Sequence, residues 1–271
     1  MSAPIAALAM YDWPEVSAAN DALWAFLHHY LAGRGIDAPG SLLHDRPYHE
    51  PWRSPDLLLA QTCGYPYATE LRTHVQLVAT PAYAAEGCQG TDYCSLIIAG
   101  RASGIQSLAG ICAATAAVNS AHSHSGYWAF RAAIARDPAA PPPRRAVLSG
   151  GHRQSLALVA DGTAGLASID AVCWALALRH QPDAAAEVRI IARSPMAPGL
   201  PLICAASISR RTVGALRDGL QAMMRDPALA PARDRLLLSG LDVLPDTAYD
   251  RILELRDLAL AKPFPGLEGG P

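Results

Sequence analysis

The chain has 271 residues, of which 51% are hydrophobic and 17% are charged. It can therefore bury the core of one large or two smaller domains, and intrinsic disorder is excluded. The formal net charge of -2 lacks the basic excess that attracts nucleic acid, so no nucleic-acid partner is expected. The 21 glycines and 22 prolines follow no fixed period, which excludes collagen-like and solenoid architectures.

Charge is unevenly distributed along the chain. Residues 1–100 carry 4 basic and 10 acidic side chains, residues 101–200 carry 9 and 5, and residues 201–271 carry 9 and 9. The middle third is therefore net positive between an acidic third and a neutral one. This shift indicates a separate middle lobe, and its positive charge suits an anionic ligand better than a cationic one.

The sequence contains no transmembrane or export signal that we can identify. The longest apolar runs, such as 108–118, are about half of the ~20 residues that span a bilayer. The first residues lack the basic region of a secretory signal, so the sequence as written predicts a cytoplasmic location.

The six cysteines contain no C-x-x-C pair, so we expect neither a zinc knuckle nor a thioredoxin-like site. They are interpreted as small buried hydrophobic residues in a reducing compartment. A disulfide between Cys88 and Cys94 is the alternative.

The first hundred residues alternate short apolar runs with helical patterns, which is typical of βαβ units around largely parallel sheets. The fold class is therefore predicted to be α/β. Each predicted strand is followed by a polar or glycine-bearing loop. The spacing predicts strands at 5–11, 57–60, 75–79 and 93–99, and helices at 17–31 and 68–74.

The rest of the chain repeats this alternation. Strands are predicted at 111–117, 146–148, 167–169, 188–192 and 202–206, and the later helices at 209–225 and 247–261, with Ser209 as an N-cap. The strands after residue 201 are too few for a third domain. We therefore predict lobe 1 from residues 1–98 and 202–271, and an inserted lobe 2 from residues 99–201.

The loop 119–127 follows a predicted strand and opens a helical pattern. The N–H groups and the positive dipole end at a helix start, together with serine hydroxyls, can hold a phosphate-sized anion. Gly126 would let the backbone approach a ligand closely. An ordinary helix cap and a metal site at His122 and His124 are the alternatives. The candidate ligand residues of this loop are Asn119, Ser123, His124, Ser125, Gly126 and Tyr127.

Two further candidates in the middle lobe also stand between a strand and a helix. His152 would lie near a helix start, where it could donate a hydrogen bond to an anion, or it is a surface or capping residue. Asp170 is interpreted as a helix cap or as a ligand-facing carboxylate. The two together as a general base remain an open alternative.

Lobe 1 supplies the other candidates, Thr62 and Tyr65 after one strand and Tyr11 and Trp13 after another. Ligands of open α/β sheets bind at the carboxyl ends of strands, which is where all these segments are predicted to lie. The sequence has no G-x-S-x-G elbow, Walker loop, G-x-G-x-x-G or H-E-x-x-H, so we predict no catalytic residues, no cofactor and no metal.

The order of these segments resembles the phosphate/phosphonate-binding proteins of ABC importers over about residues 5–265. The resemblance is carried by Q-T-C-G-Y-P at 61–66, N-x-x-x-S-x-S-G-Y at 119–127, S-G-x-H at 149–152, A-S-I-D at 167–170 and A-P-G-L-P at 197–201. It implies a type II periplasmic-binding-protein fold. Such a fold has two α/β lobes with mixed sheets and flanking helices, joined by two crossing segments, with the ligand between the lobes.

The resemblance also implies residue roles. Ser123, His124 and Ser125 would grip the oxyanion with Tyr127 nearby, and His152 would contact it. Asp170 would receive a ligand amine, whereas a second expected acidic position holds Gly199. The implied protein is a periplasmic monomer that delivers a phosphonate, phosphite or phosphate to an ABC permease. A biosynthetic enzyme or a cytoplasmic ligand sensor on the same fold is the alternative.

Overall fold

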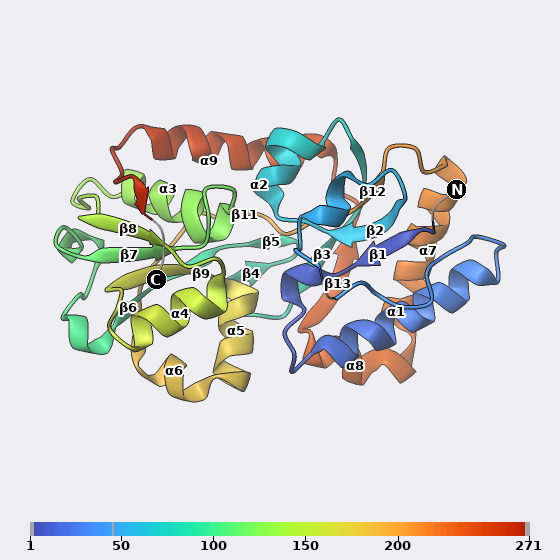
Figure 1. The fold of residues 1–271 in the computed structure, drawn as a ribbon, viewed down its shortest axis with the longest axis horizontal. Helices are drawn as coiled ribbons and strands as arrows, with labels where there is room; N and C mark the ends of the chain where they lie inside the picture. The colour runs from blue at the N-terminus through green and yellow to red at the C-terminus, as the bar shows by residue number, and fades with distance from the viewer. Residues whose placement is uncertain (1–2, 45, 269–271) are drawn as a thin grey trace. The chain divides into compact units, whose positions relative to one another are not determined.

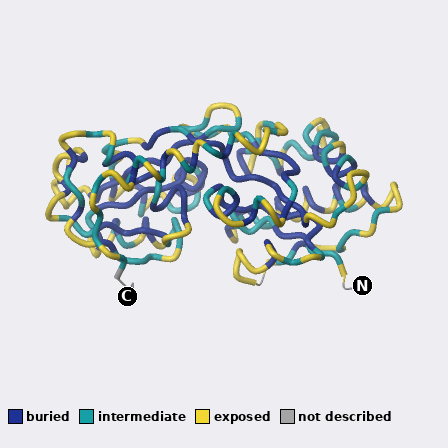
Figure 2. Tube along the Cα trace, turned by 90° about the horizontal axis from the view of Figure 1, so that it is seen from above, coloured by how far each residue is buried: buried dark blue, intermediate teal, exposed yellow. Residues whose placement is uncertain are grey.

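The structure is a computed structural model that describes residues 3–44 and 46–268. The chain divides into two compact units. Unit 1 comprises residues up to 84, 89–91 and 198–249, and unit 2 comprises 85–88, 92–197 and 250 onward. Buried segments run through the interior of each unit, whereas exposed residues lie mostly on turns and outer helix faces (Figure 2). Among the described residues, no helix combines the length and hydropathy needed to cross a membrane.

Unit 1 is built on a five-stranded mixed sheet in the order β1-β2-β12-β3-β13. The helix α1 packs against α7 and α8 (Figure 1). The Ser209 side chain caps α7 by accepting from the Thr212 N–H, as the sequence predicts. The elements are β1 (Ile5–Ala7), α1 (Ser17–Ala32), β2 (Leu57–Gln61), α2 (Gly64–Pro66), β3 (Val75–Tyr83), β12 (Leu202–Ala205), α7 (Arg210–Arg225), α8 (Ala230–Arg235) and β13 (Leu238–Asp242).

Unit 2 is built on a six-stranded sheet in the order β10-β6-β9-β7-β8-β14, with α3 and α9 on one face and α4, α5 and α6 on the other (Figure 1). The elements are β6 (Ser95–Gly100), β7 (Thr115–Val118), α3 (Ala129–Arg136), β8 (Arg145–Leu148), α4 (His152–Ala160), β9 (Leu166–Asp170), α5 (Ala171–His180), α6 (Pro182–Ala186), β10 (Val188–Arg193), α9 (Asp250–Leu260) and β14 (Leu267–Glu268). Three short strands, β4 (Cys88–Gln89), β5 (Asp92–Tyr93) and β11 (Ala197–Pro198), form a third sheet.

Both large sheets are mixed, which confirms the mixed sheets that the resemblance implies, whereas the strand–helix alternation alone suggested largely parallel sheets. In unit 2, β9, β7, β8 and β14 are parallel neighbours, whereas β6 runs antiparallel to both of its neighbours, β9 and β10. The predicted strand 111–117 is also shorter, since β7 starts only at Thr115. Leu108 and Ile111 are nevertheless buried, because a short helical turn and the bend after it place them in the core. An apolar run reports burial and does not by itself distinguish a strand from a turn.

The C-terminal residues correct the predicted lobe boundaries. Residues 250–268 belong to unit 2 and not to lobe 1, so the chain passes between the units again at Tyr249–Asp250. Residues 92–98, also predicted in lobe 1, belong to unit 2 as well. The helix α9 buries Ile252, Leu255 and Ala259 and packs against α3, and β14 adds a parallel strand to β8. An amphipathic helix shows in sequence that it has a buried face, but not which domain covers that face.

Candidate functional site

Several of the predicted ligand residues of unit 2 lie together at one edge of its sheet. The strands β8, β7 and β9 are parallel neighbours, so the loops that follow them emerge at the same edge. The loop after β7 carries Ser123 and Ser125, the loop after β8 carries His152, and β9 ends at Asp170. Strand order therefore brings together residues that are far apart in the sequence.

The loop after β7 enters its helix through a π-helical turn, His124–Trp128, which α3 continues. Ser123 caps this turn, because its Oγ accepts a hydrogen bond of 3.0 Å from the Gly126 N–H. The predicted helix start is thus at the expected place, and Ser123 acts there as an N-cap. The π-turn offers backbone N–H groups at the sheet edge together with the Ser125 hydroxyl.

Ser125 and His152 form the central contact. The Ser125 Oγ lies 2.9 Å from the His152 Nε2, although 27 residues separate them. His152 is the first residue of α4, and it follows Gly150, whose φ of +86° favours glycine. The predicted oxyanion-contacting serine and histidine are therefore hydrogen-bonded neighbours.

Three serines that are not among the predicted ligand residues form hydrogen bonds at the same loops, and one of them, Ser168, bonds Ser125 directly. The Ser168 Oγ donates to the Ser125 carbonyl at 2.7 Å, and the Ser155 Oγ donates to the Asn119 Oδ1 at 3.0 Å. The Ser149 Oγ lies 2.6 Å from the Ser155 Oγ, so Ser149 extends the hydrogen bonds of Ser155 and Asn119. Serine on a buried strand or on the inner face of a helix was the available signal, since a buried hydroxyl needs a partner.

The two histidines of the site are held neutral. Burial lowers the pKa of His124 to about 4. It lowers the pKa of His152 to about 4 as well, against a smaller opposing effect of a backbone hydrogen bond with Ser168. The site therefore presents neutral imidazole and hydroxyl groups near neutral pH. Among the residues that the structure describes, no cluster of three His, Cys, Asp or Glu side chains is arranged to hold a metal ion.

Asp170 is a helix cap in this structure. Its carboxylate is buried, and its Oδ1 accepts hydrogen bonds from the N–H groups of Val172 at 2.7 Å and Cys173 at 3.1 Å. After desolvation by burial, the charge of Asp170 is the next cause that raises the pKa of the thiols of Cys88 and Cys173. No disulfide joins Cys88 and Cys94, which are both described, so this alternative is not realised.

The hydroxyl of Tyr127 is hydrogen-bonded to Arg131. It accepts a hydrogen bond of 2.9 Å from Arg131, and its ring packs edge-on against Phe264. Only 8% of Tyr127 is exposed. The residue thus joins the π-turn to the C-terminal segment of unit 2.

The four candidates of unit 1 share an edge of its own sheet, because β1 and β2 are parallel neighbours. Thr62 is fully buried, and its hydroxyl donates to the Cys63 carbonyl at 3.3 Å. Tyr65 is half-buried, whereas Trp13 and Tyr11 are buried, and Tyr11 stacks edge-on against Tyr83. Tyr11 also lines an apolar cavity of about 60 Å³ between the sheet and the helices of unit 1.

Gly199 has no room for a side chain. A Cβ there would stand 2.8 Å from the Thr91 carbonyl oxygen and 3.5 Å from that of Pro81. The acidic residue that the resemblance implied near this position is thus excluded by the local backbone as well as absent from the sequence.

Comparison with known proteins agrees with this architecture. A model of the ABC-transporter phosphonate periplasmic substrate-binding family matches residues 54–249. No curated protein sequence matches significantly.

Several solved structures share the fold. A binding protein component of an ABC phosphonate transporter from Pseudomonas aeruginosa is 19% identical, with a TM-score of 0.72 over 96% of this chain and 87% of that one. PhnD1 from Prochlorococcus marinus in complex with methylphosphonate is 14% identical, with a TM-score of 0.72 over 96% and 98%. A Xanthomonas citri protein bound to ATP is 18% identical, with a TM-score of 0.71 over 96% and 98%. The fold is that of type II periplasmic binding proteins, as the sequence predicts. With the family model covering most of the sequence, the chain belongs to the family of periplasmic substrate-binding proteins of phosphonate ABC transporters.

Proposed function

We propose that the protein binds a small phosphorus oxyanion, a phosphonate, phosphite or phosphate, through Ser123, Ser125, His152 and the adjacent N–H groups of the π-turn. The observation that carries the proposal is the contact of 2.9 Å between Ser125 Oγ and His152 Nε2 at the start of two helices. Hydrogen bonds from neutral donors and helix starts stabilise an oxyanion without a counter-charge. The methylphosphonate bound by PhnD1 supports this ligand class.

We further propose Thr62, Tyr65, Tyr11 and Trp13 as the ligand residues of unit 1. Two observations favour a ligand without an amine. Gly199 excludes the second acidic side chain, and the Asp170 Oδ1 is engaged by two backbone N–H groups of α5. An ammonium group would need carboxylate partners.

Binding without turnover is the second part of the proposal. A serine nucleophile requires a histidine base that a third group orients and whose pKa lies near the working pH. The pKa of His152 is lowered to about 4, and its Nδ1 lies 3.5 Å from the backbone nitrogen of Asp170. Both features favour a binding site over a catalytic one.

Calorimetry with methylphosphonate, phosphite and phosphate tests the ligand class, with an uncharged sugar as the negative control. Ser125→Ala removes one hydroxyl that would bond a charged group, so affinity should fall about 10-fold to 100-fold. Ser107→Ala is the matched control, because Ser107 is an exposed serine of the same unit. No binding of any of the three anions by the wild type, or equal affinity in Ser125→Ala, contradicts the proposal.

Product analysis tests the absence of turnover. After long incubation with each anion, mass spectrometry should detect less than one product molecule per protein, and more would indicate an enzyme.

We propose a periplasmic monomer that serves an ABC permease, as the family implies. Cell fractionation and sedimentation test the location and the oligomeric state, and a purely cytoplasmic protein would favour the sensor or enzyme alternatives.

A further inference from the structure

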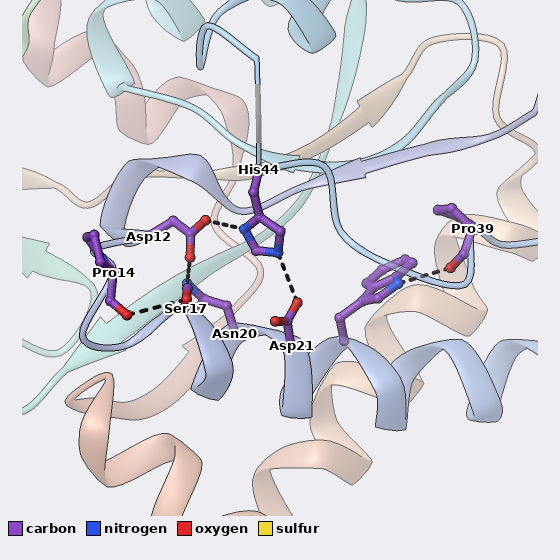
Figure 3. Close-up of polar contacts among 8 residues, drawn as sticks. Asp12, Pro14, Ser17, Asn20, Asp21, Pro39 and His44 are labelled. Atoms are coloured by element: carbon purple, nitrogen blue, oxygen red, sulfur yellow. Dashed lines mark hydrogen bonds and ion pairs between the residues drawn. The ribbon is translucent and has the colours of Figure 1, made fainter.

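His44 bridges two carboxylates within unit 1 (Figure 3). Its Nδ1 contacts the Asp12 Oδ2, and its Nε2 lies 2.9 Å from the Asp21 Oδ1. The other oxygen of Asp12 accepts a hydrogen bond of 2.9 Å from the Asn20 Nδ2. Three separate parts of unit 1 therefore meet at His44: the segment between β1 and α1, the first turns of α1, and the loop that follows α1.

The bridge requires a charged imidazole. An ionised carboxylate only accepts hydrogen bonds, so both ring nitrogens of His44 must carry a proton to satisfy both contacts. Among the described residues, the charged groups that act on the ring are Asp12 and Asp21, and the neutral Asn20 lies beside Asp12. The hydrogen bond with Asp12 is the largest cause that raises the pKa of His44 above 6.5, against desolvation. Neutral His44 can donate to only one of the two carboxylates.

The bridge fixes a segment at the edge of the sheet where ligand residues are proposed. Asp12 lies between Tyr11 and Trp13, at the carboxyl end of β1. The loop that carries His44 is also fastened beside β1, where the Leu43 N–H donates to the Ala6 carbonyl at 2.8 Å. Asp12 is the better-buried anchor, since its side chain is 11% exposed and that of Asp21 is 54% exposed.

We propose that His44 is a positioning residue that clamps the Tyr11–Trp13 segment in its binding conformation when protonated, so that acidity strengthens ligand binding. This inference rests on the proposed function, because it regulates that same site. The clamp is complete below about pH 6.5 and is lost as the pH rises through the raised pKa of folded His44. The loss releases one carboxylate from the bridge and leaves the segment less constrained.

The test compares dissociation constants for methylphosphonate between wild type and His44→Gln at about pH 6 and about pH 9. The ionisation of the ligand affects both proteins equally, so it cancels in the ratio of the two constants. We expect the wild type to bind about 2- to 10-fold more tightly than His44→Gln at the lower pH, and equally at the higher pH.

Two further variants distinguish an effect of the charge at residue 44 from a general effect of histidine replacement on folding. His44→Arg keeps a permanent cation with several donors, so it should restore tight binding and remove its dependence on pH relative to His44→Gln. His29→Gln alters an exposed histidine of α1 and should match the wild type at both pH values. A loss of affinity in His44→Gln that is equal at both pH values would show a merely structural role.

The possible failures are distinguishable. Wild-type protein that binds no phosphorus oxyanion at any pH overturns the proposed function and the regulation with it. Wild-type protein that binds, with a ratio to His44→Gln near one at both pH values, overturns the positioning role of His44 alone.

Discussion

Gly126 lies directly against the side chain of Asn119: a Cβ added at residue 126 would stand 2.4 Å from the Asn119 Cγ. Asn119 in turn accepts the hydroxyl hydrogen bond of Ser155. The glycine is thus required by the close approach of the π-turn to the polar group that ends β7. This requirement is local packing, and it fixes the turn in which the Gly126 N–H donates to the Ser123 Oγ at 3.0 Å.

Gly126→Ala should displace Asn119 and disturb the π-turn. We expect a loss of about 1–3 kcal/mol in the free energy of unfolding, as for other overpacked positions, together with weaker methylphosphonate binding. Urea denaturation and calorimetry measure the two effects.

Gly214→Ala is the matched control, because a Cβ at this position of α7 would meet open space. It should leave binding unchanged and stabilise the protein by up to about 1 kcal/mol through helix propensity. A stable Gly126→Ala variant with wild-type affinity would show that the contact with Asn119 plays no part in the site.

The stability of the protein should fall in mild acid because of His124 and His152. Each has a pKa of about 4 in the folded state, below the value of 6.5 for an unperturbed histidine. The unfolded chain therefore takes up protons first. The contribution of each histidine is complete above about pH 6.5 and is lost progressively as the pH falls to about 4, by about 3 kcal/mol per residue.

Denaturant unfolding between these pH values measures this dependence. Replacing each histidine by asparagine should flatten the pH profile, because the variant has no imidazole to protonate. A profile that the double variant leaves unchanged would mean that other groups control acid stability.

Lys262, the only lysine in the sequence, fastens the C-terminal segment to α3. Its Nζ donates to the carbonyl oxygens of Ile134, Asp137 and Ala140, at 3.0, 2.6 and 3.0 Å. Lys262→Met keeps the aliphatic stem and removes the donor, so unfolding should become easier by about 1–3 kcal/mol.

Thermal or urea unfolding checks this result against Arg210→Met, which removes an exposed cation from the first turn of α7. The Arg210 variant should lose at most a few tenths of a kcal/mol, as typical surface substitutions do. Equal effects of the two substitutions would indicate that Lys262 acts only through the net charge.

Much of the candidate site could be predicted from local sequence. A polar segment between an apolar strand and a helical pattern marks a helix start, and this rule located Ser123 and His152. It also located Asp170, whose capping role the sequence offered as an alternative. The hydrogen bond between Ser125 and His152 was not predictable, because it depends on β7 and β8 being neighbours in the sheet.

Long-range packing explains what the sequence did not reveal. Tyr127 is predicted near the ligand, and its hydroxyl also accepts a hydrogen bond from Arg131, while its ring packs against Phe264 of the C-terminal segment. That segment had been assigned to the other lobe, so nothing near Tyr127 in sequence could suggest this partner. His44 was missed for a similar reason, since it lies in a loop without apolar periodicity and gains its role only where Asp12 and Asp21 meet.

The position of α9 and β14 in unit 2 affects how the chain can fold during its synthesis. Unit 1 needs residues up to 249, and unit 2 needs the helix that begins at Asp250 and the strand β14 after it. A ribosome that works from the N-terminus therefore completes unit 1 only when residue 249 has been made, and unit 2 only when β14 has been made. Unit 1 cannot fold in complete form before residues 92–197 of unit 2 have been made, which differs from the domain-by-domain order that is common in larger proteins. Its incomplete sheets must stay protected from aggregation until these segments have been made.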